Sequence, residues 1–140
     1  MLAKLNERLS TLKARDESGF TLIELLVVLI IIGVLLAIAV PSYLGFKDKS
    51  QKTAAAADVR EGEPSAEAYY SDNNSYASIS KAAMQTYDSG LSPDIQTVAG
   101  GATHYCISAK NGNWYAHVVG PGGTITQGET TNFCATWTAS

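Results

Sequence analysis

The sequence has little charge, few cysteines and no excess of basic residues. Charged residues make up 16% of the 140-residue chain, well below the roughly 25% usual in soluble domains. Two cysteines are too few for a disulfide-rich scaffold or a four-thiolate zinc site. The formal net charge is -3 and the pI is near 5.3, so the chain lacks the excess of basic residues that is typical of nucleic-acid-binding proteins. The length excludes a large multidomain enzyme, and the shortage of charge argues against a soluble cytosolic protein.

The missing charge is concentrated in one segment, since no charged residue occurs from Leu25 to Phe46. The run from Phe20 to Val40 is apolar apart from Thr21 and Glu24. As a helix it would span roughly 31 Å, close to the hydrocarbon thickness of a bilayer. A secretory signal peptide would have a shorter run followed by small residues at a cleavage site. Here the small residue, Gly19, precedes the run, so we expect a membrane-spanning helix.

Glu24 is the one ionisable residue in this run. A carboxylate in hydrocarbon is costly and by default indicates a functional group. Glu24 lies about one turn from the start of the run, where the interface relieves part of this cost. Taken alone, the residue is either functional or a tolerated polar group at a helix end.

The residues around Glu24 closely resemble the processing site and membrane anchor of type IV pilins and pseudopilins. The resemblance extends from Gly19 to about Ser50, and its centre reads SGFTLIELLVV over residues 18–28. In that family a prepilin peptidase cleaves after the glycine, the new N-terminal residue is N-methylated, and a glutamate four residues later is the hallmark. The resemblance therefore implies cleavage between Gly19 and Phe20, methylation of Phe20, and assembly through Glu24.

Helix geometry agrees with that role of Glu24, because residues four apart lie on one face. After cleavage, the carboxylate can pair with the new α-amine of Phe20 in its own chain or in a neighbouring chain. We favour the neighbouring chain, because pairing between subunits would explain why a carboxylate lies in an otherwise apolar helix. Gly33 and Pro41 fall where pilins commonly carry helix-loosening residues. Pro41 also predicts a kink or local unwinding.

Three segments are expected: a leader over 1–19 removed by the peptidase, a membrane-spanning and filament-core helix over 20–41, and the rest of the helix with a globular head over 42–140. Four basic residues precede the apolar run and four follow it closely, so this count does not decide the orientation. The resemblance implies a single-pass precursor in the cytoplasmic (inner) membrane, with the leader in the cytoplasm and the head outside it. The mature form would lie in an extracellular pilus or a periplasmic pseudopilus.

Beyond the membrane segment we expect the helix to continue, now amphipathic, to about Asp72. Its apolar face would include Val59 and Ala66, and a bend is expected at 62–64, where Gly62 and Pro64 interrupt the run. A short helix is predicted over 78–87 with Ser78 or Ser80 as its cap. Residues 98–103 are predicted to form a glycine-rich loop.

The last forty residues change to a composition typical of strands. Residues 103–109 and 113–119 are predicted to form a hairpin around Asn111-Gly112, and shorter strands are predicted over 124–126 and 132–137. The predicted fold is α+β, with an antiparallel sheet of three or four strands packed on the amphipathic half of the helix.

Cys106 and Cys134 are both placed on predicted strands. A disulfide is the expected state if the head lies outside the cytoplasm, and type IV pilins often close a C-terminal loop with such a pair. Two alternatives use the same residues. Cys106 could act as a nucleophile with His104 or His117, or both cysteines and both histidines could bind zinc, although they lack close ligand spacing.

The resemblance implies a structural subunit of a type IV pilus-like filament for adhesion, motility or DNA uptake. Such a subunit is no enzyme and needs no cofactor or metal. Its partners would be copies of itself, the prepilin peptidase and methyltransferase, the inner-membrane assembly platform, and membrane lipid before assembly. After cleavage six basic and ten acidic residues remain, so charge gives no indication of nucleic-acid binding.

Two alternatives to a pilus subunit remain. The first is a pseudopilin of a type II secretion or competence system. Major pseudopilins usually hold calcium in an acid-rich C-terminal loop, whereas Glu129 is the only acidic residue after Asp94 here, which favours the pilus subunit. The second is a membrane-anchored extracytoplasmic binding module or enzyme.

Overall fold

A computed structural model describes residues 19–139, so the predicted leader, apart from Gly19, lies outside the described residues. Residues 19–139 contain a long helix, a short helix, four strands and a 3-10 turn. They are α2 (Leu22–Asn73), α3 (Lys81–Met84), β1 (Ile95–Gly100), β2 (Tyr105–Asn111), β3 (Trp114–Gly120), β4 (Thr126–Glu129) and η1 (Phe133–Ala135). The chain divides into two units whose boundary follows Ser42. Each unit is described separately below.

The first unit is the apolar part of α2, which exposes its large hydrophobic side chains on every side. Its length and composition are sufficient to cross a membrane. The helix runs through Gly33 and Pro41 without interruption, so the local unwinding considered at Pro41 does not occur. A proline removes only one backbone donor, and the helical turns on both sides retain theirs. A loosening role for Gly33 and Pro41 stays a prediction.

The second unit is the α+β head that the sequence predicts. Helix α2 continues through it to Asn73, so the helix is not interrupted at Gly62 and Pro64 as predicted, while the bend expected there stays a prediction. Gly62 is buried against the sheet, where an added Cβ would lie 3.3 Å from the side chains of both Ile95 and Met84. Burial of the apolar face around Gly62 offsets the cost of Pro64.

The four strands form one antiparallel sheet in the order β1-β2-β3-β4. The β2–β3 hairpin closes with Asn111 opposite Trp114. Gly112, in the turn between them, has a φ of 57°, a conformation that glycine adopts without steric cost. This hairpin confirms the strongest strand signal in the sequence.

Strand β1 corrects the loop predicted over 98–103, because Val98, Ala99 and Gly100 pair with β2. Gly100 is required at the end of this strand. A Cβ there would lie 2.1 Å from the carbonyl oxygen of Tyr76, so only a glycine permits this close backbone approach.

Three further elements differ from prediction in extent or type. Helix α3 has four residues instead of ten, with Ser80 as the N-cap, and β4 starts at Thr126 instead of residue 124. The strand predicted over 132–137 is wrong, because residues 133–135 form η1. The physical reason is tertiary, since Cys134 is bonded to Cys106 and Asn132 to side chains of the sheet.

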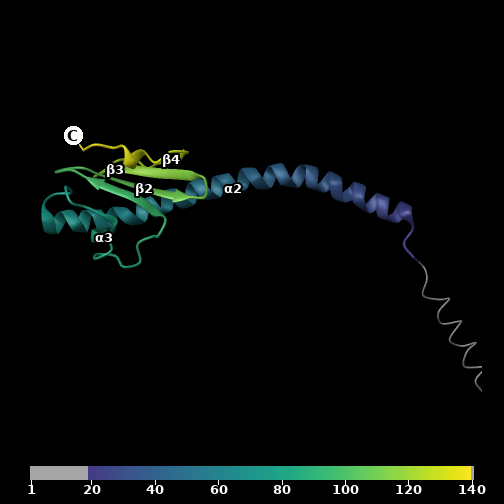
Figure 1. The fold of residues 1–140 in the computed structure, drawn as a ribbon, viewed down its shortest axis with the longest axis horizontal. Helices are drawn as coiled ribbons and strands as arrows, with labels where there is room; N and C mark the ends of the chain where they lie inside the picture. The colour runs from purple at the N-terminus through teal and green to yellow at the C-terminus, as the bar shows by residue number, and fades with distance from the viewer. Residues whose placement is uncertain (1–18, 140) are drawn as a thin grey trace, which may run out of the picture. The chain divides into compact units, whose positions relative to one another are not determined.

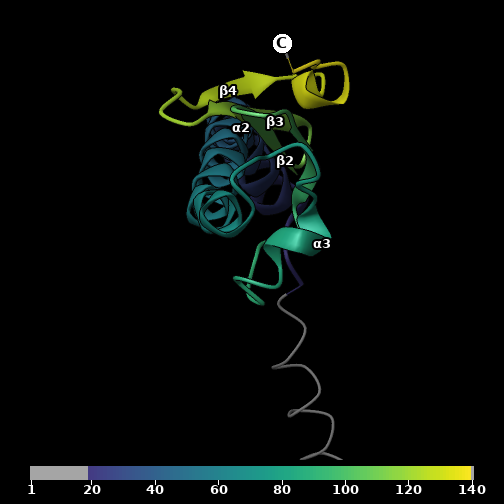
Figure 2. The ribbon, with the colours of Figure 1, turned by 90° about the vertical axis from the view of Figure 1, so that its left-hand side faces the viewer.

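The head has three layers, because β2 is covered on both faces. Alternate side chains Tyr105, Ile107 and Ala109 join the apolar core. Val59 and Ala66 of α2 belong to the same core. Cys106 lies on the opposite face, together with Ser108, and both contact the C-terminal segment. Figures 1 and 2 show the head portion of α2 on one side of the sheet and the C-terminal segment on the other.

Candidate functional site

The N-terminal end of α2 is closed by a reciprocal pair of hydrogen bonds between Thr21 and Glu24. The Thr21 backbone amide and hydroxyl both donate to Glu24 Oε2, at 2.7 and 2.8 Å, and the Glu24 amide donates to Thr21 Oγ1 at 3.3 Å. This arrangement is a capping box. It also places a carboxylate at the positive end of the helix dipole.

The capping role of Thr21 was missed in the sequence, although the pattern Thr-x-x-Glu before an apolar run is its signal. Both hydrogen bonds that Thr21 donates, one from its backbone amide and one from its hydroxyl, fall on one carboxylate oxygen of Glu24. Within residues 19–139, Glu24 Oε1 accepts no hydrogen bond, so it has room for a further donor. Phe20, which would carry the new amine, directly precedes the cap.

The helix surface around Glu24 is otherwise apolar. Phe20, Ile23, Val27 and Val28 line a shallow hollow with Glu24. All four of these apolar side chains are at least 47% exposed. Exposed apolar surface of this extent requires lipid or a protein partner.

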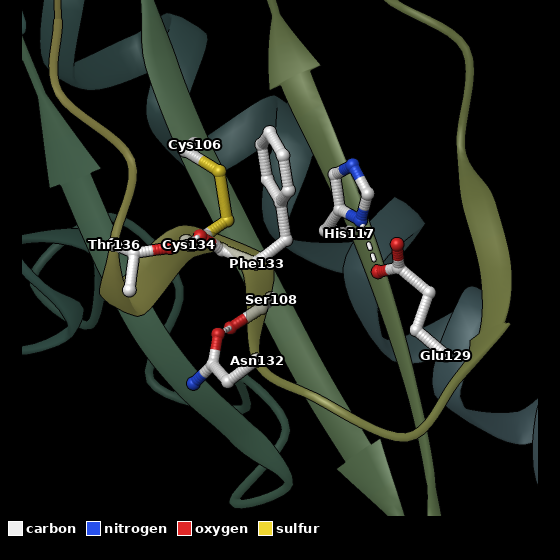
Figure 3. Close-up of polar contacts among 8 residues, drawn as sticks. All are labelled: Cys106, Ser108, His117, Glu129, Asn132, Phe133, Cys134 and Thr136. Carbon is white, nitrogen blue, oxygen red and sulfur yellow. Dashed lines mark hydrogen bonds and ion pairs between the residues drawn. A yellow bond between two sulfur atoms is a disulfide. The ribbon is translucent and has the colours of Figure 1, made fainter.

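The second feature of interest is the disulfide between Cys106 on β2 and Cys134 on η1 (Figure 3). Their Cα atoms are 5.6 Å apart, as expected for a disulfide, and the pairing implied by the resemblance is present. Because both sulfurs are bonded, Cys106 offers no thiolate for the nucleophile alternative, and the zinc alternative loses two ligands.

The two histidines also have other partners. His104 Nδ1 lies 2.8 Å from Thr103 Oγ1. His117 Nδ1 lies 2.6 Å from Glu129 Oε2, and its ring stacks on Phe133 with 4.2 Å between centroids (Figure 3). His117 therefore helps to hold the C-terminal segment against β3.

Asn132 adds a polar clamp beside the disulfide. Its Oδ1 accepts a hydrogen bond from Ser108 Oγ at 2.7 Å, and its Nδ2 donates to Thr97 Oγ1 at 2.8 Å. Thr97 and Ser108 face each other across β1 and β2. One amide side chain thus joins the C-terminal segment to two strands, a role that no motif in the sequence indicated.

A tyrosine cluster holds the sheet to α2 on the opposite face. The hydroxyls of Tyr76 and Tyr105 donate to the two carboxylate oxygens of Glu67, at 2.9 and 3.2 Å. Burial, followed by the bond to Glu67, raises the pKa of Tyr76 to about 12. Burial and the charge of Glu67 also raise the pKa of Tyr105 above its ordinary value.

Comparison with known proteins gives one family match in the N-terminal region and matches to individual proteins. Residues 14–40 match the family described as "Prokaryotic N-terminal methylation motif". The chain is 34% identical over 108 residues to the "Type IV wide pilus major component PilA4" of Thermus thermophilus, which covers 73% of this chain and 82% of that protein.

The chain also resembles proteins of a secretion system. It is 38% identical over 65 residues to the "Type II secretion system core protein G" of Aeromonas hydrophila, covering 46% of each chain. It is 41% identical over 66 residues to the protein of the same name from Escherichia coli, again covering 46% of each. The match thus spans about half the length of these secretion proteins.

Proposed function

Since this chain belongs to the family of type IV pilins and type II secretion pseudopilins, we propose that it is the structural subunit of a type IV pilus-like filament. The subunit is made as a membrane-anchored precursor, cleaved after Gly19, N-methylated on Phe20 and polymerised through its N-terminal helix. One observation carries the proposal: the methylation-motif match over residues 14–40 coincides with the start of an exposed apolar helix.

The apolar part of α2 serves two successive roles in this proposal. Before assembly it anchors the precursor in the membrane, with the leader in the cytoplasm and the head outside. After extraction it packs among copies of itself as the filament core. The membrane and the filament core would each cover the apolar helix surface, which is exposed in the isolated chain.

Glu24 directs the register of assembly. Cleavage after Gly19 creates an α-amine on Phe20, and Glu24 of a neighbouring subunit pairs with it. An ion pair in apolar surroundings provides specificity more reliably than stability. The capping box supports this role, because it holds the carboxylate at the helix end with one oxygen left for the neighbour.

The partners follow from this life cycle. They are the prepilin peptidase and methyltransferase that process the precursor, the inner-membrane assembly platform that extracts it, and further copies of the chain. The role is structural and not enzymatic. The filament would act in adhesion, motility or DNA uptake.

A pseudopilin of a secretion or competence system is the second candidate, supported by the secretion relatives. Two observations favour the pilus subunit. The pilus component of Thermus matches 73% of the chain, including part of the head, whereas the two secretion proteins match 46%. In addition, the C-terminal segment is closed by a disulfide instead of being rich in carboxylates.

The proposal is tested by producing the chain together with its peptidase and assembly platform and examining material sheared from the cells. Electron microscopy with an antibody to the head should show labelled filaments. Glu24→Gln should be processed and remain in the membrane without entering filaments. Thr21→Val is the matched control, because it removes the two hydrogen bonds of the Thr21 hydroxyl but keeps the carboxylate and the backbone bond to it, and it should assemble.

Two results would contradict the proposal. If the wild-type chain stays in the membrane fraction and no sheared filament carries the antibody, the filament role is wrong. If Glu24→Gln assembles as well as Thr21→Val, the carboxylate does not direct assembly.

A further inference from the structure

The start of the head carries a group of lysines and aromatic residues, here called the juxtamembrane patch. It consists of Lys47, Lys49 and Lys52 on α2, Lys110 on β2, and Trp114 and Tyr115 on β3. We propose that the juxtamembrane patch binds anionic phospholipid headgroups, and so docks the head on the membrane surface before assembly. This contact is separate from the insertion of the apolar helix, and it does not depend on filament formation.

The lysines of the patch are not neutralised by carboxylates. The only ion pair within residues 19–139 is that of His117 with Glu129. Lys47 and Lys49 are exposed. Four of the six basic residues in the unit after Ser42 belong to this patch, whereas most of its nine acidic residues lie elsewhere. The four lysines outnumber the three acidic residues beside them, Asp48, Asp94 and Glu129, so this end of the head is weakly basic and suits an anionic lipid surface.

The aromatic residues of the patch hold two of the lysines. Lys52 Nζ lies 3.8 Å from the centre of the Trp114 ring, and Lys110 Nζ lies 5.2 Å from that of Tyr115. Cation–π contacts leave the ammonium hydrogen-bond donors available on the side away from the ring. Tryptophan and tyrosine are also the residues enriched at the level of lipid headgroups, so the patch has the composition of a membrane interface.

The acidic residues near the patch have partners within the head. Asp48 accepts a hydrogen bond from Trp114 Nε1 at 3.3 Å. Asp94 accepts one from Asn111 Nδ2 at 3.2 Å, and Glu129 is paired with His117. Their charges reduce the positive potential of the patch but do not occupy its lysines.

The position of the patch along the chain fits a lipid surface. Tyr43, Leu44 and Phe46 are more than half exposed at the start of the head unit, and Lys47 follows them directly. At 1.5 Å per residue, Lys47 lies about 10 Å and Lys52 about 18 Å beyond Val40, where the apolar run ends, and the headgroup layer is roughly 5–8 Å thick. Lysine side chains extend toward such a layer from just outside it.

The β2–β3 hairpin completes the patch from the other side. The hairpin turn packs on α2 at this level, because a Cβ on Gly112 would lie within 2.4 Å of the Gln51 side chain. Trp114 follows the turn and contacts both Asp48 and Lys52. The sheet thus brings Trp114 to the helix turns that carry Asp48 and Lys52. Lys110 and Tyr115 lie at the same end of the sheet on its other face, because they neighbour the core residues Ala109 and Ala116 along their strands.

The two tryptophans of the chain allow a direct test in proteoliposomes of the full-length protein. Trp137→Phe leaves Trp114 as the reporter in the patch. Quenching of its fluorescence is measured with a phosphatidylcholine that carries a nitroxide on its headgroup. Vesicles of phosphatidylcholine alone are compared with vesicles that also contain phosphatidylglycerol. Quenching should be about twofold greater in the anionic vesicles, and added salt should reduce the excess.

Matched variants assign the effect to the patch. The combined change Lys47→Gln, Lys49→Gln and Lys110→Gln should remove the excess quenching, while Lys52 stays in place because it contacts the reporter. Arg60→Gln, a change of an exposed arginine on α2 outside the patch, should preserve the excess. Trp114→Phe leaves Trp137, which follows the Cys134 anchored near the opposite end of β2. This reporter should respond equally in both kinds of vesicle.

Equal quenching of Trp114 in neutral and anionic vesicles would overturn the inference. So would an excess that survives the triple lysine variant, or one that Arg60→Gln removes as fully. Flotation of the same vesicles distinguishes failure of the docking from failure of the membrane anchor that the proposed function requires. Protein that fails to float contradicts both the membrane anchor and the docking, whereas floating protein with equal quenching contradicts the docking alone.

Discussion

Tyr105 on β2 donates a hydrogen bond to Glu67 on α2, at 3.2 Å between the hydroxyl and the carboxylate oxygen. Tyr76 donates to the other oxygen of the same carboxylate at 2.9 Å. The rings of the two tyrosines contact each other, with centroids 4.8 Å apart, and both side chains are about 1% exposed. One carboxylate thus joins helix, sheet and the connection after the helix.

This cluster predicts a loss of stability in alkali. The folded-state pKa of Tyr76 is raised to about 12, above the unfolded value near 10. The protonated hydroxyl therefore stabilises the fold fully below about pH 10, and this contribution is lost as the pH rises toward 12. The melting temperature of the full chain in detergent, followed by circular dichroism, should fall across this interval.

Substitution of the tyrosine provides the control. Tyr76→Phe should reduce stability at neutral pH and flatten the fall in melting temperature above pH 10. Tyr115→Phe, which leaves the Glu67 cluster intact, should keep the wild-type slope. If Tyr76→Phe and the wild type lose stability in parallel between pH 10 and 12, the cluster is not the cause.

The disulfide should provide a large part of the stability of the head. Cys106 and Cys134 are 28 positions apart, and closing a loop of that size contributes about 3–4 kcal/mol in the chain-entropy model. Cys134→Ser should lower the melting temperature by more than about 10 °C in non-reducing buffer. The difference from the wild type should disappear when both proteins are fully reduced. An unchanged melting temperature without reductant would show that the pair is not bonded.

The free energy of unfolding should fall when the Asn132 side chain loses either its carbonyl acceptor or its amide donor. Asn132→Asp removes the donor to Thr97, and Asn132→Ala removes the contact with Ser108 as well. Each change should cost roughly 1–3 kcal/mol, because partly buried polar groups lose partners. The exposed neighbour Thr131, changed to Ala, should alter the unfolding free energy by less than about 0.5 kcal/mol. Equal denaturant midpoints for the Asn132 and Thr131 variants would argue against the clamp.

Gly100 should not tolerate a side chain. An added Cβ would meet the carbonyl oxygen of Tyr76 at 2.1 Å, and a backbone atom cannot move aside cheaply. Gly100→Ala should therefore destabilise the head by roughly 1–3 kcal/mol. In Gly45→Ala the new Cβ has no neighbour within 4 Å, so this control should be neutral or slightly stabilising. Similar denaturation curves for the two variants would contradict the close approach.

The elements predicted correctly from the sequence have local signals. The apolar run predicts the first half of α2 by hydrophobicity alone, and burial of Val59 and Ala66 confirms the apolar face predicted for its second half. Asn111 and Gly112 predict the β2–β3 hairpin through the conformational freedom of glycine. These features depend on residues close together in the chain, so the sequence contains enough information to predict them.

The elements predicted wrongly depend on distant partners. Gly62 and Pro64 are helix breakers by propensity. In the fold, however, the absence of a side chain on Gly62 allows Ile95 and Met84 to pack closely against the helix. Gly100 looks like a loop residue until its approach to Tyr76 is known. Residues 132–137 have strand composition, but the bonds of Asn132 and Cys134 to the sheet fold that segment as a 3-10 turn. Tertiary contacts overrode local preference in each case.

Among the functional and structural residues, too, those with a local motif were predictable and those with distant partners were not. Gly19, Phe20 and Glu24 were identified from a motif of fixed spacing, and the cap formed by Thr21 could have been identified from the same residues. The hydrogen bonds of Asn132 and Glu67 had no sequence signal, because their partners lie 24–38 residues away or are separated by a turn. Their roles become clear only in the folded head.

The most direct test of the central claim is the intact mass of the protein sheared or extracted from its native host, measured without reductant. The account predicts the mass of residues 20–140 plus one methyl group and minus two hydrogens, and Gly19→Ala should leave the uncut precursor. A wild-type mass that includes residues 1–19 would show that no prepilin peptidase acts on the chain and would contradict the account.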